Sequence, residues 1–160
     1  MKKIVVCFLL VLNFGCTDND DNELSPEPFT PVAITPTLIG KNNLNGSEGI
    51  SQQTTVITNE TDWNTFKNEI DSYYQPFGIN YTEDYFSETT IDFTSYTVIV
   101  IFDQVYGNGG HTIDITDITE YEETIIVTVE NLQTGNATSI MTQPYHIVKI
   151  PLAAKPIVFE

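Results

Sequence analysis

After about residue 30, apolar and polar residues alternate along short stretches of the chain, which is the pattern of half-buried β-strands. Two strands are predicted first, over residues 32–39 and 54–58, and Gly40 is expected to end the earlier one. Asn45-Gly46 lies between these stretches and is a typical turn sequence. The pattern therefore predicts that the N-terminal part of the domain begins as β structure.

A helix is predicted directly after the second strand. Asn59 can cap its N-terminus, and Asp62 follows three residues later as the partner in a capping box. Trp63, Phe66 and Ile70 have the spacing i, i+3 and i+7, which places them on one helical face. We expect this apolar face to pack in the core.

The middle of the chain contains three stretches with different patterns. Residues 78–90 show no clear period and are expected to form an irregular connection. Residues 98–102 form an unbroken apolar run, which predicts a strand covered on both faces. Residues 107–110 supply three glycines that can adopt positive φ, so a tight hairpin turn is expected there.

The C-terminal third has the pattern of further β structure. A turn is predicted near Tyr121-Glu122, and a longer loop is predicted over residues 131–138. Four strands are expected around these connections, at residues 112–116, 125–130, 145–150 and 156–159. The predicted fold is therefore mainly β with an α+β tendency: an antiparallel sheet or compact β-sandwich with one early amphipathic helix, in a single domain over residues 31–160.

The N-terminus has the order of a secretory signal. Lys2 and Lys3 precede an apolar run over residues 4–14, and Gly15 then precedes Cys16. This run is far shorter than the roughly 20 residues of a membrane-spanning helix. A small residue before a cysteine at the end of such a run resembles the lipobox of bacterial lipoproteins. Residues 1–15 are therefore predicted to be a signal peptide, and Cys16 is predicted to be acylated.

Residues 16–30 are predicted to be an acidic, proline-rich, disordered tether. They contain too little apolar surface to offset the entropy of ordering the chain. An acidic run after the lipidated cysteine resembles a signal for transport to the outer cell surface in some Gram-negative groups. We therefore expect a lipid-anchored protein of the cell envelope, in the outer membrane and exposed at the surface.

The charge of the chain limits its partners. After residues 1–15 are removed, four lysines and 22 acidic residues remain, and the sequence contains no arginine, so the side-chain charge is −18. Phosphate groups are recognised mainly by Lys and Arg, so nucleic acid is excluded as an expected partner.

Three segments resemble the PrcB-type protease-complex subunits: Asp92-Phe93 before an apolar strand, residues 107–113, and residues 144–151. The resemblance covers roughly residues 56–160. Members of that family are small exported lipoproteins that associate with a surface protease and stabilise it, without known chemistry of their own. They usually carry an aromatic residue after the double glycine, where this chain has His111.

The sequence offers little for catalysis. Its only histidines are His111 and His146, whereas a zinc site needs three or four ligands, and the carboxylates show no characteristic spacing. No serine lies in a Gly-x-Ser-x-Gly elbow. We therefore expect no catalytic residues, no metal site and no cofactor.

Three functional classes fit these observations. We favour a non-enzymatic surface lipoprotein that binds and stabilises or tethers a partner protein, with an extracytoplasmic protease as the expected partner. The alternatives are a protease inhibitor that acts through its loops and a surface glycan-binding protein that uses exposed aromatic residues, such as Tyr73, Tyr74, Tyr81, Tyr85 and Phe86.

Loops presented by a rigid sheet are common binding sites, so the glycine-rich loop is the candidate contact surface, with residues 131–143 as its expected neighbour. Its residues are Tyr106, Gly107, Asn108, Gly109, Gly110 and His111. The opposing interpretation is that the glycines only close a hairpin.

Overall fold

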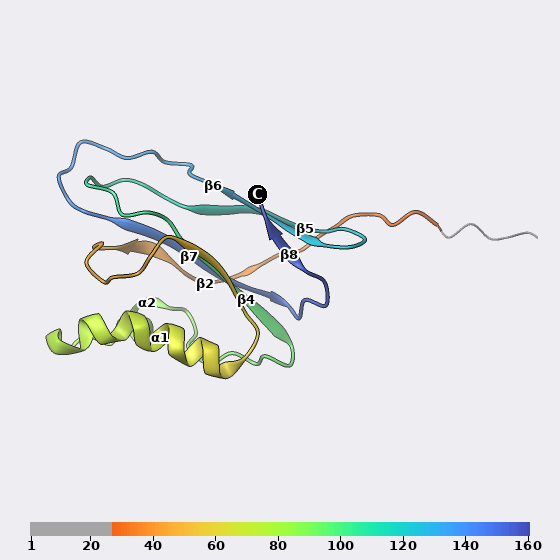
Figure 1. Ribbon diagram of the computed structural model, residues 1–160, viewed down its shortest axis with the longest axis horizontal. Helices are drawn as coiled ribbons and strands as arrows, with labels where there is room; N and C mark the ends of the chain where they lie inside the picture. Colours follow the sequence, from red (N-terminus) through yellow and green to blue (C-terminus); the bar gives the residue numbers. More distant parts are fainter. Residues whose placement is uncertain (1–26) are drawn as a thin grey trace, which may run out of the picture.

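The computed structural model describes residues 27–160, which form two stacked four-stranded sheets with helices on the outside of one of them (Figure 1). The predicted signal peptide, Cys16 and most of the predicted tether lie outside the described residues. The prediction of a mainly β, antiparallel fold with one early amphipathic helix is confirmed.

We call the sheet that contacts the helices the central sheet and the other the outer sheet. The central sheet has the strand order β2 (Thr37–Leu44), β7 (Gln143–Pro151), β4 (Tyr96–Phe102), β3 (Gln53–Ile57), with every pair antiparallel. The outer sheet has the order β1 (Val32–Ala33), β5 (Asp114–Glu120), β6 (Ile125–Glu130), β8 (Ile157–Phe159). Only the β6–β8 pair is parallel in the described chain.

β4 lies inside the central sheet and is covered on both faces, as its unbroken apolar sequence predicts. Val98, Val100 and Phe102 face the helices, in the same cluster as Trp63 and Ile147. Ile99 and Ile101 face the outer sheet, where they pack with residues of β5 and β6. The alternation of side chains along the strand thus joins two separate hydrophobic cores.

Helix α1 (Glu60–Tyr74) begins and packs as its sequence predicts. The Oδ1 atom of Asn59 accepts a hydrogen bond from the amide of Asp62 at 2.9 Å, and the side-chain amide of Asn59 donates to Asp62 Oδ2 at 2.7 Å. Trp63, Phe66 and Ile70 are all buried against the central sheet. The Trp63 indole also donates to the carbonyl of Thr89 at 2.8 Å, so its one polar atom is satisfied.

The prediction of one strand over residues 32–39, ended by Gly40, is wrong. The chain leaves the outer sheet after β1, passes Pro36, and enters the central sheet as β2, which continues through Gly40. A Cβ atom at Gly40 would lie 2.9 Å from the Phe86 ring, so glycine lets this ring pack across the strand. The pairing register shifts between Leu38 and Gly40, which marks a β-bulge.

The prediction that residues 78–90 are wholly irregular is also wrong, because they contain the short helix α2 (Tyr81–Tyr85). A 3₁₀ turn (Gln75–Phe77) joins it to α1. The carboxylate of Asp71 is buried and accepts from the amide and the hydroxyl of Thr82 at 2.9 and 2.7 Å. A tertiary contact of this kind, rather than an apolar period, positions α2.

Residues 107–110 do not close a hairpin. β4 belongs to the central sheet and β5 to the outer sheet, so residues 103–113 cross from one sheet to the other. Only Gly110 of the three glycines has positive φ, at 78°. The turn near Tyr121 does close the predicted β5–β6 hairpin, with the Tyr121 amide donating to the carbonyl of Thr124 at 2.8 Å.

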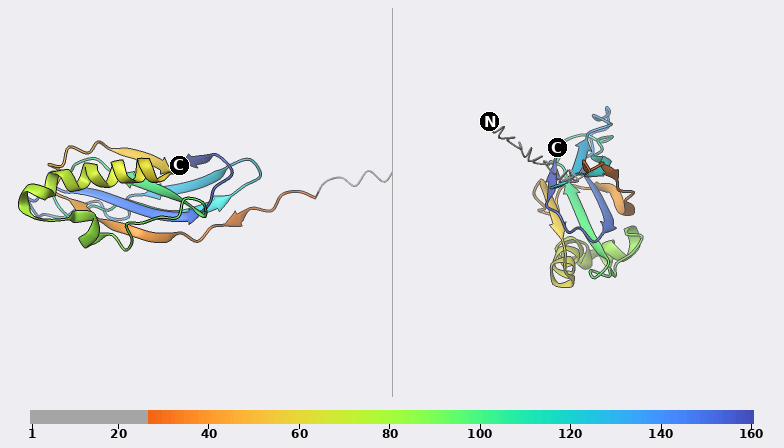
Figure 2. Two further views of the ribbon diagram at one scale, coloured as in Figure 1. Left: turned by 90° about the horizontal axis from the view of Figure 1, so that it is seen from below. Right: turned by 90° about the vertical axis from the view of Figure 1, so that its right-hand side faces the viewer.

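The described chain enters the fold at one end, and three connections meet at the opposite end, which we call the distal end (Figures 1 and 2). These connections are residues 45–52, 103–113 and 131–142. The C-terminal end of α1 lies at the distal end as well (Figure 1).

Candidate partner-binding surface

Two loops at the distal end are joined along their length by backbone hydrogen bonds. We call residues 103–113 the crossover loop and residues 131–142 the long loop. Tyr106 and Thr142 exchange two backbone hydrogen bonds, at 2.8 and 3.0 Å. The amide of Asn136 donates to the carbonyl of Gly109 at 2.8 Å. The two loops that the sequence analysis placed together are therefore in direct contact.

Asp103 connects these loops through its buried carboxylate. Its Oδ1 atom accepts from the amide of Gln104 at 2.8 Å. Its Oδ2 atom accepts from the hydroxyl of Tyr106 at 2.8 Å and from the side-chain amide of Asn131 at 2.6 Å. One carboxylate thus orders both the start of the crossover loop and the start of the long loop.

The Tyr106 and His111 rings stack on each other inside the crossover loop. Their centroids are 3.6 Å apart and their planes differ by 7°. His111 is only 8% exposed, and its Nε2 atom lies 3.1 Å from Asn108 Oδ1. The ring closes the loop from within rather than projecting toward solvent, and burial raises the pKa of the Tyr106 hydroxyl.

The candidate contact residues therefore differ in accessibility. Gly107 is exposed, Tyr106, Asn108 and Gly110 are half-buried, and Gly109 and His111 are buried. A Cβ atom at Gly109 would lie 2.5 Å from Thr138 Oγ1, so this glycine allows the long loop to approach. Two of the predicted contact residues thus hold the loop pair together.

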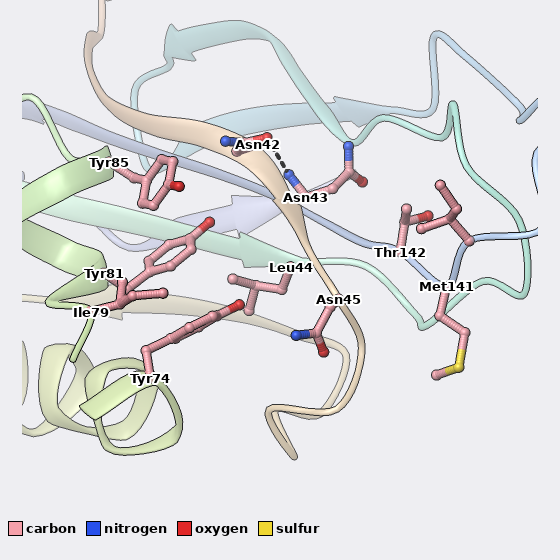
Figure 3. Close-up of a pocket in the computed structure, with 11 residues that line it drawn as sticks. Asn42, Asn43, Leu44, Asn45, Tyr74, Ile79, Tyr81, Tyr85, Met141 and Thr142 are labelled. Atoms are coloured by element: carbon pink, nitrogen blue, oxygen red, sulfur yellow. Dashed lines mark hydrogen bonds between the residues drawn. The ribbon is translucent and has the colours of Figure 1, made fainter. Parts of the chain in front are cut away.

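A cleft of about 310 Å³ lies beside the long loop, between the helices and the end of β2 (Figure 3). One wall comes from the helical segment, the other from β2 and the residue after it, and the long loop borders it. The lining residues are Tyr74, Ile79, Tyr81 and Tyr85, then Asn42, Asn43, Leu44 and Asn45, then Ile140, Met141 and Thr142.

Three tyrosines form a stacked ladder on the helical wall, with their hydroxyl groups directed toward β2 (Figure 3). Tyr81 stacks on Tyr74 and on Tyr85 with centroid distances of 4.6 and 4.5 Å. The Tyr74 hydroxyl donates to Glu48, and the Tyr81 hydroxyl lies 3.2 Å from that of Tyr145. Burial raises the pKa of Tyr74 and of Tyr81 above the usual range, so both phenols are neutral.

Apolar side chains are exposed around the cleft. Ile140 is 64% exposed, Tyr85 52% and Met141 48%. Leu132 of the long loop and Val105 of the crossover loop are exposed at the same end. Clustered apolar exposure of this kind is typical of an interaction surface.

A second cavity, of about 280 Å³, lies between β2 and the crossover loop. Asn42 and Asn43 line it as well as the cleft, together with Lys41 and residues 111–113. Lys41 forms an ion pair with Asp114. Burial alone would raise the pKa of this carboxyl, but its hydrogen bonds from Lys41 and Thr112 hold the pKa below the usual value.

The aromatic residues suggested for glycan binding are only partly available. Tyr81 and Phe86 are buried in the core that the helices cover, and Tyr73 and Tyr74 are half-buried. Tyr85 is the one member of this set that is exposed. The expectation of five exposed aromatic residues is therefore wrong for four of them.

The two histidines occupy separate environments. His146 lies between the sheets, and its Nδ1 atom accepts from the amide of Ile115 at 2.9 Å. Burial and the nearby charge of Lys41 lower the pKa of His146 to about 4. Within residues 27–160, no three His, Cys, Asp or Glu side chains are grouped as metal ligands.

Comparison with known proteins gives no family. No family model, no curated protein and no solved structure matches this chain. The resemblance to PrcB-type subunits remains a prediction from three short segments. The helices of residues 27–160 include none with the length and apolar character needed to cross a bilayer.

Sequence reasoning did not assemble the cleft, and it missed the wall formed by β2 and Asn45. Residues 42–44 were assigned to no element, between a strand expected to end at Gly40 and a turn at Asn45-Gly46, and Ile140 and Met141 were named only within the neighbouring segment 131–143. These residues meet only because β2 and β7 pair, which places Leu44 opposite Gln143. Exposed apolar residues in a polar loop, such as Ile140, were the one signal that could have indicated the surface.

Proposed function

We propose that this chain is a non-enzymatic, lipid-anchored envelope protein whose distal end binds a partner protein and stabilises or tethers it. The supporting observation is the apolar surface of the distal end, where the cleft and the two bonded loops lie together. An extracytoplasmic protease is the expected partner, on the basis of the resemblance to PrcB-type subunits.

The position of this surface fits an anchored protein. The described chain begins at the end opposite the loops (Figure 1). An anchor at Cys16 followed by a tether would leave the distal end facing away from the membrane. The loops are also preorganised by the Asp103 carboxylate, which lowers the entropy lost on binding.

The proposal is tested by site-specific photo-cross-linking in intact cells. A photoreactive amino acid replaces Ile140 at the distal end or, as the control, Tyr121 in the β5–β6 turn at the opposite end; both side chains are exposed. We expect a covalent adduct with one protein partner from position 140 and none from position 121. Equal cross-linking at both positions, or none at position 140, would contradict the proposal.

A protease inhibitor is the second candidate, because the hydrogen bonds between the crossover loop and the long loop give the firm loop geometry that such inhibitors use. The two functions differ in one measurement. A stabilising subunit lengthens the active lifetime of the captured protease, whereas an inhibitor lowers its initial rate.

A further inference from the structure

β2 is an edge strand of the central sheet. It pairs with β7 on one side, and no strand of residues 27–160 pairs with its other side. Near its start that open side is covered by Ser87, which donates through its amide to the carbonyl of Ile39 at 2.7 Å and through its hydroxyl to the carbonyl of Leu38 at 2.8 Å. This cover stops before Gly40.

The backbone groups of Lys41 and Asn43 point away from β7. Asn43 lies opposite Pro144, which has no amide hydrogen and whose carbonyl accepts from Asp103 on the other side, at 2.9 Å. The amide of Asn43 donates instead to the side chain of Asn42 at 2.9 Å. Because orientation alternates along an antiparallel ladder, Lys41 has the same outward orientation as Asn43.

Two cavities flank this part of the edge, on opposite faces of the central sheet. The cleft lies on the helical face, and the second cavity lies toward the crossover loop. Asn42 and Asn43 line both, and the buried Oδ1 atom of Asn43 has no hydrogen-bond partner within residues 27–160. Side chains of a strand alternate between its two faces, so a strand added along β2 would direct successive side chains into the two cavities.

The charge of this chain indicates which side chains an added strand of the partner would carry. Each lysine in residues 27–160 is already bonded within the chain: Lys41 to Asp114, Lys149 to Glu88, Lys155 to Glu120 and Lys67 to the carbonyl of Thr89. Glu83 and Asp84 are exposed on α2, next to Tyr85 of the cleft. Neither carboxylate forms an ion pair within residues 27–160, and exposed carboxylates of this kind favour a basic ligand.

From these observations we propose that an extended segment of the partner, with alternating apolar and basic residues, pairs with Lys41 and Asn43 of β2 as an added strand. One of its apolar side chains occupies the cleft beside Tyr85. Main-chain hydrogen bonds then provide affinity, and the two cavities provide specificity. This inference rests on the proposed function, because it assigns the mode by which the distal end binds its partner.

The first test selects peptides from a displayed library of random sequences, about 12 residues long, on the full lipidated protein in detergent. We expect enrichment of sequences that alternate apolar residues with Lys or Arg. The enriched peptide is then synthesised with N-methyl groups at alternate backbone positions. Methylation of the residues that face β2 should abolish binding, whereas methylation of the others should leave it unchanged. This comparison uses the wild-type protein and so does not depend on the folding of a variant.

The second test changes the strand edge. Asn43→Pro removes the outward amide while leaving the β2–β7 ladder intact, because that amide makes no ladder bond. Affinity for the enriched peptide should fall by about tenfold or more. Asn43→Ala is the matched comparison, because it removes the same side chain but keeps the outward amide, so the peptide should bind this variant about tenfold more tightly than Asn43→Pro.

Three results would overturn the inference: no enriched peptide, equal binding of both methylated peptides, or self-association of the protein through β2 in sedimentation. Photo-cross-linking from position 140 separates this failure from failure of the proposed function. A partner adduct that persists in Asn43→Pro would keep the distal-end function and reject strand addition. Absence of the adduct in the wild-type background would reject both.

Discussion

His146 is held neutral by its position between the two sheets. Its Nδ1 atom accepts the Ile115 amide, which requires that this nitrogen carry no proton. Lys41 and Asp114 lie near enough to act on it in opposite directions, and burial dominates over both. Protonation of the ring would break the hydrogen bond that joins β7 to β5, so the two sheets are linked by a group that titrates.

We predict that stability falls as pH drops from about 6.5 to about 4, because the pKa of His146 is lowered from 6.5 to about 4 on folding. Above 6.5 the ring is neutral in both states; below that, the unfolded state binds the proton first. At about 1.4 kcal/mol per pKa unit, the free energy of unfolding should decrease by roughly 2–3 kcal/mol across this range. Chemical denaturation at a series of pH values measures it.

His146→Asn is the control for this prediction, because an amide oxygen can accept the Ile115 amide without titrating. The variant should show a much smaller decrease between pH 6.5 and 4. Asp114 acts in a separate range: its pKa is lowered on folding, so its contribution is lost only as pH falls below about 4. An identical pH profile for wild type and His146→Asn would contradict the assignment.

The role of a single residue was predictable where it depends on neighbours that are close in the sequence. Asn59 caps α1 and Trp63 is 1% exposed, because both roles depend on spacing within a few residues of sequence. Gly40 and His111 were misread, because each is determined by a distant neighbour. Phe86 packs over Gly40, and the long loop covers His111. Neither neighbour could be assigned before the fold was known.

At the scale of elements, hairpins follow from the local sequence pattern, whereas crossovers between sheets depend on distant strands. The β5–β6 hairpin and β4 follow from alternating or unbroken apolar patterns and were expected. The segment at residues 107–110 has the composition of a hairpin turn, yet it connects two sheets. The strands before and after this segment, β4 and β5, pair with other strands: β4 lies beside β7 in the central sheet, and β5 lies beside β1 in the outer sheet. A turn-like sequence fixes local flexibility and does not fix which strands become partners.

We predict that Asp103→Ala loosens the crossover loop and the long loop together. The change leaves four donors, on Gln52, Gln104, Tyr106 and Asn131, without their shared acceptor, so the free energy of unfolding should decrease by about 2–4 kcal/mol. Amide hydrogen exchange should accelerate in residues 103–113 and 131–142 and stay slow in β4 and β7. Capture of the partner through position 140 should weaken in parallel.

Asp92→Ala is the matched control, because the Asp92 carboxylate also accepts several hydrogen bonds, from Thr94 and Ser95, but is exposed before β4. It should leave exchange in both distal loops and partner capture unchanged. Faster exchange throughout the sheets of Asp103→Ala would show that the carboxylate supports the whole fold and not the loop pair.

At the scale of the whole molecule, the layered arrangement separates the end where the described chain enters the fold from the end that carries the cleft. Every strand of the central sheet runs along the long axis, so its connections gather at two ends (Figure 2). One end receives the chain at residue 27, and the other carries the cleft and the bonded loops (Figure 1). A mainly β fold, as one antiparallel sheet or a β-sandwich, was expected from the sequence, but this polarity was not. This polarity depends on the direction in which each strand runs, and strand pairing in the sheets determines that direction.

The proposed polarity has meaning only if the chain is anchored where the sequence predicts. Cys16→Ala should release the protein from membranes or leave it as an uncleaved precursor, and it should abolish incorporation of labelled palmitate. Each buried lipid CH₂ contributes about 0.8 kcal/mol to membrane affinity, so loss of the acyl chains removes nearly all of that affinity. Cys7→Ala is the control, because Cys7 lies in the apolar run that is predicted to be removed as a signal peptide, and it should change nothing. The released Cys16→Ala protein should still cross-link to its partner from position 140, since the distal surface folds without the anchor. Unchanged membrane fractionation of Cys16→Ala would refute lipidation, and loss of the cross-link in released, folded protein would show that the membrane itself takes part in binding.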